Sequence, residues 1–319
     1  MQNRNSQQKI HLMNNGILII DKPVGLTSHD VVSRLRRILK TKSIGHTGTL
    51  DPFATGVLVM LIGKATRLAR FLDKDEKEYQ ALVRFGFETE TGDLTGEIRS
   101  GVSNPGSLTL SDIEKILPEF RGEILQTPPM YSAKKIEGKK LYELARKGIE
   151  IERKAVNVRI SKLEIAAANF ENEAISDGYE TRDLRLNVAC TAGTYIRVLA
   201  EDIGKKVGIG AHLAELRRVR AGKFDLEKAI TIEELEEIAG KPALSDVVIP
   251  MSSAVSHLPE VVLDPEEIEK TRNGVKYKFE DPNLADRQPV RMLTVAGELA
   301  AIGFFDSAEK YIQPKVVLL

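Results

Sequence analysis

The chain has 319 residues, with 46 lysines and arginines against 46 acids, so its formal net charge is zero. Zero net charge argues against a general polyanion binder, and a hydrophobic content of 42% allows one large domain plus a small one. The single cysteine, Cys190, excludes an internal disulfide and favours a reducing cytoplasm.

Metal centres and membrane spans are disfavoured by the same inventory. The five histidines have no metal-ligand spacing, so we expect no metal. No apolar run is long enough to span a bilayer. The first fifteen residues are polar and lack the apolar core of a signal peptide, and we expect them to form a disordered extension.

The first third of the chain predicts strands on either side of a helix and a glycine-rich loop. Residues 16–20 read as a short buried strand. Thr27 or Ser28 is expected to cap the helix that follows. Further predicted elements are a helical face at 31–39, a strand buried on both faces at 57–62, a short helix at 65–72, a strand at 79–87 and a turn-rich segment at 89–96.

The glycine-rich loop contains one acid. Residues 45–56 read Gly-His-Thr-Gly-Thr-Leu-Asp-Pro-Phe-Ala-Thr-Gly, so three glycines permit left-handed backbone and Pro52 fixes the chain directly after Asp51. A carboxylate on a stiff loop beside a buried strand can act as a nucleophile or a base. It can equally cap backbone amides in a turn, and the pattern alone gives the two interpretations equal weight.

The middle of the chain contains a helix, an extended proline-rich segment and a basic segment. Ser111 and Glu114 predict a capping box for a helix that Pro118 ends. Residues 126–133 are expected to be extended, because each proline disfavours helix before it. The other predictions here are a connection at 101–107, a basic helix at 139–147 ended by Gly148, a strand at 156–165 and a polar loop or hairpin at 169–182.

The last third begins with a strand at 184–190, a turn around Gly193 and a helix at 196–207, which puts residues 193–197 at an edge suited to a site. Strands and helices alternate without a regular rhythm, which favours an α+β fold over a doubly wound sheet. Dinucleotide, P-loop and nucleophile-elbow motifs are absent from the sequence. The final predictions are an acidic helix at 232–238, a linker at 241–250 and a small β-rich domain after it.

Charge is unevenly distributed along the chain. Residues 130–159 hold nine lysines and arginines against four acids, whereas residues 225–270 hold twelve acids against three lysines. Such asymmetry indicates one face built for an anion and another that is only solvated. Ordinary charged helices explain the acidic stretch well and the basic stretch less well.

Six segments, in order, resemble one known family. The first four are 22–28, 45–56, 77–79 and 193–197. Two more agree, 126–132 and 212–224, the first continuing into Lys134, Gly138, Tyr142 and Arg146 and the second containing Leu216, Arg217 and Arg218. Together they resemble the TruB family of tRNA pseudouridine synthases over roughly residues 16–240. The tail from about Pro250 resembles, less closely, a PUA-type RNA-binding domain, and the short tail and residues 169–182 depart most from the family.

The resemblance implies a fold and an activity. The fold is α+β, a pseudouridine synthase fold with a central mixed, mostly antiparallel sheet, flanking helices and a small C-terminal β-rich PUA-like domain. The activity is isomerisation of the T-loop uridine at tRNA position 55, by flipping the base, cleaving its glycosidic bond and rejoining the sugar to carbon 5, with no cofactor. The implied boundaries are a catalytic domain at 16–248 with a basic RNA-binding flap at about 124–153, and the PUA-like domain at 249–319.

The resemblance also assigns three catalytic residues. Asp51 is the essential carboxylate, and whether it attacks the anomeric carbon, attacks carbon 6 or removes a sugar proton stays open. Arg197 is expected to pair with Asp51 and keep it ionised, although a helix-surface ion pair fits the pattern equally well. Tyr79 is expected to pack on the target base and assist proton transfer from carbon 5. From the residues alone, a strand tyrosine with a satisfied hydroxyl is the better interpretation.

The resemblance also implies which residues contact the substrate. Tyr195 and Leu216 match residues that line the uridine pocket, and otherwise they are core residues. His46 is expected to contact RNA where bases are displaced, against the alternative of a surface histidine. Lys22 is expected to build the site or meet a phosphate, against a solvated loop lysine. The predicted contacts to the RNA backbone are Lys134, Lys135, Lys139, Lys140, Arg146 and Lys147 of the flap, and Arg217 and Arg218 of a second strip with Arg220 and Lys223.

Four functions compete at this point. The first is a stand-alone tRNA uridine isomerase, cytoplasmic and monomeric, with tRNA as its partner and no obligatory protein partner or membrane. The second is an RNA-binding or tRNA-folding module without turnover, which the presence of Asp51, Tyr79 and Arg197 disfavours. The third is a guide-RNA-dependent pseudouridine synthase, which the small tail and the basic flap disfavour. The fourth, a carboxylate hydrolase, lacks a suitably placed second acid.

Overall fold

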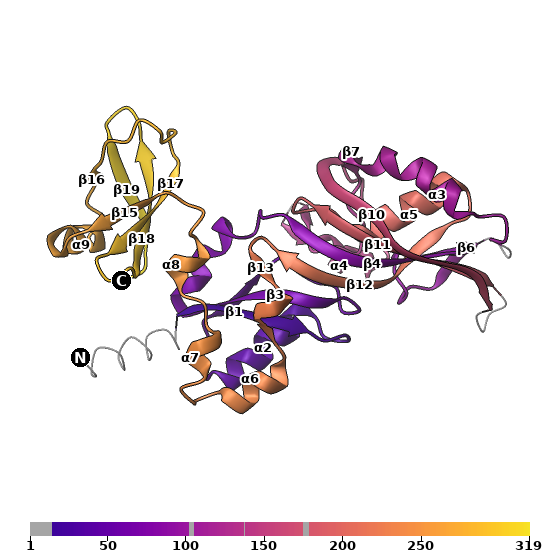
Figure 1. Ribbon diagram of the computed structural model, residues 1–319, viewed down its shortest axis with the longest axis horizontal. Coiled ribbons are helices and arrows are strands. Elements are labelled where there is room, and N and C mark those ends of the chain that lie inside the picture. Colours follow the sequence, from indigo (N-terminus) through magenta and orange to yellow (C-terminus); the bar gives the residue numbers. More distant parts are fainter. Residues whose placement is uncertain (1–14, 102–104, 137, 175–178) are drawn as a thin grey trace.

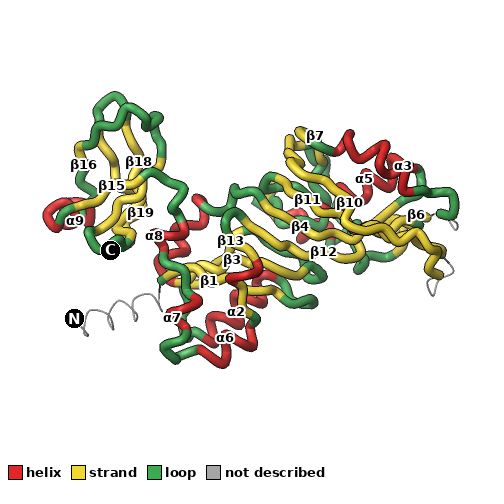
Figure 2. The backbone as a smooth tube through the Cα atoms, viewed as in Figure 1, coloured by secondary structure: helices red, strands yellow, loops and turns green. Residues whose placement is uncertain are grey.

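The computed structural model describes residues 15–101, 105–136, 138–174 and 179–319. The disordered extension predicted for the first fifteen residues therefore lies, except for Asn15, outside the described residues. Figure 1 shows a long sheet flanked by helices, and a smaller β-rich domain at the C-terminal end of the chain. Strands form most of the regular structure of both (Figure 2).

Within the described residues, ten strands form one mixed sheet. They are β1 (Gly16–Lys22), β2 (Ile44–Thr47), β3 (Thr55–Ile62), β4 (Lys77–Phe85), β7 (Gly122–Gln126), β10 (Val156–Ala174), β11 (Glu180–Cys190), β12 (Ala211–Ala221), β13 (Phe224–Asp225) and β14 (Ala229–Ile230). The main path is β14-β1-β3-β12-β4-β11-β10-β7, while β13 pairs with β12 and β2 with β3. Only β1–β14 and β3–β12 are parallel among these described pairs, which confirms the predicted α+β class with a mixed, mostly antiparallel sheet.

Helices cover the sheet and take their ends from local signals. Thr27 caps the first of them, as predicted, because its hydroxyl accepts from the Asp30 amide while the Asp30 carboxylate accepts from the Thr27 amide. The helices are α2 (Ser28–Ile38), α3 (Leu110–Ile116), α4 (Leu141–Ala145), α5 (Ile196–Val207), α6 (Ile232–Ile238), α7 (Leu244–Val247) and α8 (Met251–Ala254), with 3-10 helices η1 (Gly63–Phe71), η2 (Leu117–Phe120) and η3 (Leu226–Lys228).

One prediction in the middle of the chain was wrong in detail. Helix α3 is capped by Thr109 with Asp112, rather than by Ser111 with Glu114. The α-helix ends at Ile116, just before Pro118 as predicted, and Pro118 lies in the first turn of the separate 3-10 helix η2, where its missing amide would have no partner.

Of two further polar segments, one differs from the prediction and the other confirms the hairpin alternative. The predicted basic helix at 139–147 is instead a hairpin of β8 (Lys135–Ile136) and β9 (Lys139–Lys140) followed by the shorter helix α4. Residues 169–182, predicted as a loop or hairpin, extend strands β10 and β11 into a long hairpin whose tip lies outside the described residues. A second small hairpin, β5 (Phe87–Thr89) with β6 (Ile98–Gly101), contains the predicted turn at 89–96.

The C-terminal domain is β-rich, as predicted. Its strands are β15 (Glu260–Leu263), β16 (Tyr277–Lys278), β17 (Pro289–Thr294), β18 (Leu299–Asp306) and β19 (Tyr311–Val317), joined in the order β15-β17-β18-β19-β16, with α9 (Pro265–Arg272) beside them. Ile249, at the predicted boundary, exchanges backbone hydrogen bonds of 2.9 and 2.7 Å with Ile17 of β1. The assignment of this domain to the PUA type and the exact boundaries stay predictions.

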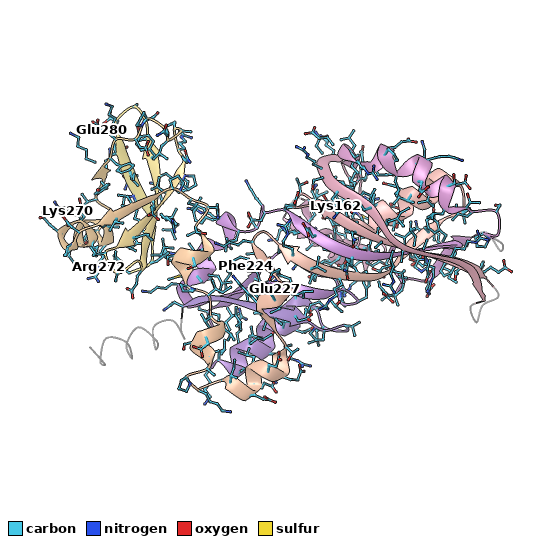
Figure 3. The ribbon with its side chains drawn as sticks, in the orientation of Figure 1. Lys162, Phe224, Glu227, Lys270, Arg272 and Glu280 are labelled. Carbon is cyan, nitrogen blue, oxygen red and sulfur yellow. The ribbon has the colours of Figure 1, made fainter. Side chains whose placement is uncertain are left out.

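Strand β3 is buried on both faces, as its apolar run predicts. Leu58 belongs to the main core beneath α2, α5 and α6, whereas Val59 belongs to a second hydrophobic cluster. That second cluster also contains Leu293 and Ile302 of the C-terminal domain. Phe224, another member, lies nearer to the C-terminal domain than Lys162 of β10 does (Figure 3). No helix among the described residues is long and apolar enough to cross a membrane.

Candidate functional site

A cavity of about 230 Å³ opens where five segments of the large sheet and its connections meet. These segments are the loop before β3, the start of β4, residues 132–133 after β7, the turn that leads into α5, and β12. The residues that line the cavity include Asp51, Tyr79, Ser132, Tyr195, Arg197 and Leu216. Three of the first four segments that carry the family resemblance contribute to this cavity, namely 45–56, 77–79 and 193–197. Within the described residues, no group of His, Cys, Asp and Glu side chains could hold a metal ion.

The loop that carries Asp51 is fixed at both ends by close backbone packing. Gly56 has a φ of +98°, and a Cβ there would lie 2.1 Å from the Arg218 carbonyl oxygen, because β3 and β12 approach each other at this point. Lys22 holds the other side, since its ammonium group donates to the carbonyl oxygens of Pro23, Leu26 and Pro52 at 2.8, 2.7 and 3.3 Å. The glycine and the lysine therefore make the loop stiff.

Arg197 joins three segments that are far apart in the sequence. Its Nε lies 3.0 Å from a carboxylate oxygen of Asp51. Its two terminal nitrogens donate to the carbonyl oxygens of Thr91 and Tyr131, at 2.7 and 2.6 Å. The side chain is only 5% exposed. Because every nitrogen of the guanidinium has an acceptor, its plane is fixed relative to the Asp51 carboxylate.

The Asp51 carboxylate lies at the mouth of the cavity, with 35% of its side chain exposed. Burial raises the pKa of its carboxyl group above the ordinary value, the Arg197 charge opposes that rise, and the nearby Asp93 charge adds to it. A carboxylate whose solvation is partly replaced by a fixed guanidinium is suited to attack or to accept a proton, which a capped turn residue is not. The geometry therefore favours the reactive interpretation of Asp51.

Asp93 is a second acid on Arg197 that the sequence analysis did not single out. Its carboxylate lies 3.6 Å from an Arg197 nitrogen, and its side chain is 6% exposed. The other carboxylate oxygen accepts from the Thr91 hydroxyl and from the Thr95 amide and hydroxyl, at 2.8, 3.0 and 2.6 Å. The sequence shows only a turn at these residues, because the partner arginine is about a hundred residues away.

Gln126 is another residue that sequence reasoning missed. It is 1% exposed, and its side-chain amide accepts from the Tyr195 amide at 3.0 Å and donates to the Tyr195 carbonyl at 3.2 Å. This pairing fixes the residue directly before α5, and hence the first turn that carries Arg197. Tyr195 itself is half-buried and lines the cavity.

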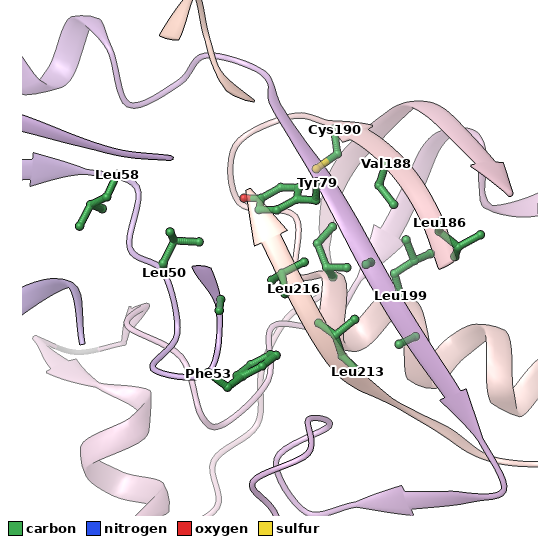
Figure 4. Close-up of a cluster of buried hydrophobic side chains, with 14 of the residues drawn as sticks. Leu50, Phe53, Leu58, Tyr79, Leu186, Val188, Cys190, Leu199, Leu213 and Leu216 are labelled. Atoms are coloured by element: carbon green, nitrogen blue, oxygen red, sulfur yellow. The ribbon is translucent and has the colours of Figure 1, made fainter. Parts of the chain in front are cut away.

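Tyr79 and Leu216 lie in the wall of the cavity and also in the main hydrophobic core (Figure 4). Each is 8% exposed. Burial raises the pKa of the Tyr79 hydroxyl, and the Arg218 guanidinium opposes that rise. A phenol with a raised pKa stays protonated at neutral pH.

Two residues predicted to meet RNA phosphates are buried instead. Lys22 has no exposed surface, and burial lowers its pKa to about 8. Arg218 is 1% exposed, and it donates to the carbonyl oxygens of Val57 and Gly48 at 2.7 and 2.9 Å. The phosphate contacts predicted for both conflict with this burial, since backbone carbonyls take the donors of Lys22 and two nitrogens of Arg218. Both residues build the loop, which for Lys22 was the other half of the prediction.

Arg217 and His46, two other residues predicted to contact RNA, are partly exposed. Arg217 is partly exposed, but it forms a two-pronged ion pair with Asp21 at 3.1 and 2.7 Å, which competes with any phosphate. His46 lies in β2 rather than in the loop, and its buried Nδ1 has no partner among the described residues. Burial and then the Arg218 charge lower the pKa of His46, so the ring is neutral at pH 7.

Five basic side chains of the flap form no ion pair with a described acid. Lys135, Lys139, Arg146 and Lys147 are exposed and Lys134 is half-buried. None of these five forms an ion pair with another described residue, and the side chain of Lys140 lies outside the description. Beneath the flap, a larger hollow of about 710 Å³ has a mixed lining that includes Glu201, Asp202, Arg153 and Lys205. Because this larger hollow is lined by charges of both signs and does not contain Asp51, the smaller cavity is the candidate site.

A second basic region, which we call the basic strip, went unnoticed in the sequence. Between residues 31 and 72 the only acid is Asp51, yet this stretch contains eight lysines and arginines. Ser43 connects the turn after α2 with the start of η1, because its carbonyl accepts from the Gly63 amide at 2.7 Å and its hydroxyl donates to the Gly63 carbonyl at 3.0 Å. None of the eight forms an ion pair with a described acid. The strip consists of Arg34, Arg36, Arg37, Lys40, Lys42, Lys64, Arg67 and Arg70.

Two family models match most of the chain. The model described as TruB family pseudouridylate synthase (N terminal domain) matches residues 36–196, and the model described as tRNA pseudouridylate synthase B C-terminal domain matches residues 197–256. The boundary between them falls at Arg197, so the cavity takes residues from both matched regions.

Curated relatives align over almost their full length. A protein of Pelotomaculum thermopropionicum named tRNA pseudouridine synthase B is 46% identical over 318 residues, which covers 95% of this chain and 97% of the relative. Proteins of the same name from Solibacter usitatus and Bacillus subtilis are 43% and 39% identical, covering 90% and 96% of this chain and 94% and 98% of the relatives.

Solved structures agree with the fold. A chain in a Cbf5-Nop10-Gar1 complex matches with a TM-score of 0.72 and 26% identity, over 98% of this chain and 87% of that chain. A chain in an H/ACA RNP bound to a substrate RNA containing 2'-deoxyuridine matches with a TM-score of 0.71 and the same identity and coverage. With the family models and the full-length relatives, these matches lead to one conclusion: the chain belongs to the TruB family of pseudouridylate synthases.

Proposed function

We propose that this protein converts the T-loop uridine of tRNA, at position 55, into pseudouridine, with Asp51 as its essential carboxylate. The observation that carries this proposal is the Asp51–Arg197 pair, in which a carboxylate at the mouth of a cavity is held by a guanidinium with no freedom to turn. Relatives that align end to end with this chain and are named tRNA pseudouridine synthase B support tRNA as the substrate.

The reaction is an isomerisation whose atoms balance within the nucleotide. The bond from the sugar C1′ to N1 breaks, a bond from C1′ to C5 forms, the hydrogen leaves C5, and N1 gains a proton. Asp51 supplies the one ionised group that this needs, by attack at C1′ or C6 or by removal of a sugar proton. Arg197 keeps the carboxylate charged in a partly desolvated site and fixes its direction.

The walls of the cavity suit an extruded base. A uridine in a folded T loop must be unstacked before it reaches Asp51, at a cost of about a few kcal/mol. Tyr79, Leu216 and Tyr195 offer flat or apolar surface for the base, which recovers part of that cost by stacking and burial. His46, neutral at pH 7 and only partly buried on β2, is proposed to contact RNA without forming an ion pair with a phosphate.

Two basic surfaces are proposed to hold the RNA backbone. The first is the flap, with Lys134, Lys135, Lys139, Lys140, Arg146 and Lys147. The second is the basic strip, which lies on α2 and η1 and includes the turn that leads into β2 and His46. Localised basic surfaces on a neutral protein suit the binding of one rigid, folded RNA better than the non-specific binding of polyanions in general. We place the enzyme in the cytoplasm, as a monomer without an obligatory partner.

Neutralising the basic strip should weaken tRNA binding through a loss of phosphate contacts. Arg37 and Lys42 are exposed and hold no side-chain hydrogen bond with a described residue, so Arg37→Ala with Lys42→Ala should leave the fold intact. The slope of log affinity against log salt, measured by filter binding, should become shallower by about 1–2. The matched control is Lys228→Ala with Lys241→Ala, two exposed lysines within the acidic stretch, which should leave the slope unchanged. Equal slopes for all three proteins would remove the strip from the RNA interface.

The proposed function is tested by release of tritium from C5 of uridine in an unmodified T-arm stem-loop. The wild-type protein should release one tritium per target uridine without added metal, nucleotide or second RNA. Release only in the presence of a guide RNA would favour the guide-dependent alternative. Tight tRNA binding without any release would favour a tRNA-folding module.

A further inference from the structure

Ser132 carries a buried hydroxyl without a hydrogen-bond partner among the described residues. The residue is 5% exposed and lines the cavity that contains Asp51 and Arg197. Native structures rarely leave a buried hydroxyl unpaired, because the lost hydration is not replaced. An unpaired hydroxyl in the wall of a cavity indicates that the occupant of the cavity supplies its partner.

The backbone on both sides of Ser132 is fixed. Its amide donates to the Met130 carbonyl at 2.9 Å, and its carbonyl accepts from the Tyr142 amide at 3.0 Å. The carbonyl of the preceding residue, Tyr131, accepts from Arg197 at 2.6 Å. The backbone that carries the hydroxyl is therefore held by the same arginine that pairs with Asp51, and the position of Ser132 in the cavity wall is fixed.

Other buried polar side chains of the same wall already have partners. The donors of Arg197 bind Asp51 and two backbone carbonyls. Arg218 donates to the carbonyls of Val57 and Gly48, and its side chain is also the hydrogen-bond partner of Tyr79. The Lys77 ammonium donates to the carbonyls of Asp73 and Asp75, and the Thr194 hydroxyl donates to Thr191. This leaves the Ser132 hydroxyl to read a polar group of the bound base.

We propose that Ser132 Oγ hydrogen-bonds the edge of the extruded uracil that carries N3–H and its two flanking carbonyls. This inference rests on the proposed function. Conversion of uridine to pseudouridine is equivalent to turning the base about the axis through N3 and C6, which exchanges N1 with C5 and O2 with O4. The N3–H stays in place, and each carbonyl is replaced by the other. A hydroxyl both donates and accepts, so Ser132 can hold this edge before and after the turn.

Removal of the hydroxyl separates this role from a role in folding. Ser132→Ala deletes no hydrogen bond to a described residue, so its thermal unfolding midpoint should equal or exceed that of the wild type. Ser28→Ala is the matched stability control, because the Ser28 hydroxyl exchanges hydrogen bonds of 3.1 and 2.9 Å with the Leu50 backbone, and its midpoint should fall.

The rate should respond in the opposite order to stability. Single-turnover conversion of a T-arm stem-loop by Ser132→Ala should be slower by about tenfold to a hundredfold, since a polar group of the base is left unpaired. Ser245→Ala, on α7 and remote from the cavity, should react at the wild-type rate.

Altered bases then test which edge is read. The target uridine is replaced by 3-deazauridine, 4-thiouridine or 2-thiouridine, each of which changes one group of that edge. At least one replacement should slow the wild type more than it slows Ser132→Ala, because the two changes remove the same hydrogen bond. A wild-type rate for Ser132→Ala, or equal slowing of both proteins by all three bases, would overturn the inference. Lack of wild-type turnover on plain uridine would instead overturn the proposed function.

Discussion

Replacement of Asp51 by asparagine should abolish turnover while leaving tRNA binding unchanged. Asp51→Asn keeps the shape of the side chain but removes the charge, so neither attack on the nucleotide nor proton removal remains available. We expect single-turnover conversion to fall by at least about 10³-fold. Tritium release measures the rate, and filter binding of intact tRNA measures the affinity, which depends on basic surfaces away from the carboxylate.

Stability measurements make the same variant more informative. The pKa of Asp51 is raised in the folded state, so its ionised form opposes folding above that pKa, and stability falls as pH rises through the interval between the unfolded and folded values. Asp51→Asn removes this opposition, although Arg197 loses a partner, so the variant should unfold near the wild-type temperature. Asp51→Glu keeps the charge but shifts it by one methylene, and should be slower than wild type and faster than Asp51→Asn. Turnover by Asp51→Asn within tenfold of wild type would exclude Asp51 as the essential carboxylate.

Opposite shifts in the pH dependence should follow from changing the two charges around Asp51. Arg197→Met removes the charge that lowers the pKa of Asp51, so the acid limb of kcat/KM should move to higher pH. Asp93→Asn removes a charge that raises the same pKa, so the limb should move to lower pH. The asparagine can still accept the hydrogen bonds of the turn, which makes it close in shape to the original.

The magnitudes of these two changes should differ strongly. Arg197→Met also leaves two neighbouring carboxylates without their shared counter-charge, and should cost about 3 kcal/mol of stability and about 10²–10⁴-fold in rate at neutral pH. Asp93→Asn should be the milder variant. Rates measured from pH 5 to 9, below the unfolding temperature of each protein, give the limbs. Shifts of both variants in one direction would contradict the charge arrangement, since loss of structure alone does not reverse sign between them.

Local sequence signals predicted the elements around the site well, because those signals act over a few residues. The apolar runs at 16–20 and 57–62 gave strands β1 and β3, and the Thr27 cap gave the start of α2. The pairing of Asp51 with Arg197 came from the resemblance to a family, since no local pattern relates residues so far apart. Asp93 and Gln126 were missed for the same reason. Each looks like an ordinary turn or strand residue until α5 is packed against it.

The prediction that Arg217 and Arg218 of β12 both contact the RNA backbone was wrong for a reason that the sequence already contained. Neighbouring residues of a strand point to opposite faces, so both arginines of β12 cannot meet the same RNA surface. Arg217 points toward solvent and Asp21, while Arg218 points beneath the loop of Asp51. Lys22 was misjudged through its residue type, because lysines are seldom buried, and only the three carbonyls around its ammonium group explain its position.

The burial of β3 between two hydrophobic cores bears on how such an enzyme can change over evolutionary time. One core extends from β3 through residues of η1 and α8 into the C-terminal domain, and it includes Leu293, Ile302 and Val316 of that domain. A domain that merely added affinity could be deleted, exchanged or fused elsewhere in a genome with little consequence for catalysis. Here its loss would expose to water part of the hydrophobic cluster to which Val57, Val59 and Leu61 of β3 belong, so the two domains are constrained to be inherited as one unit.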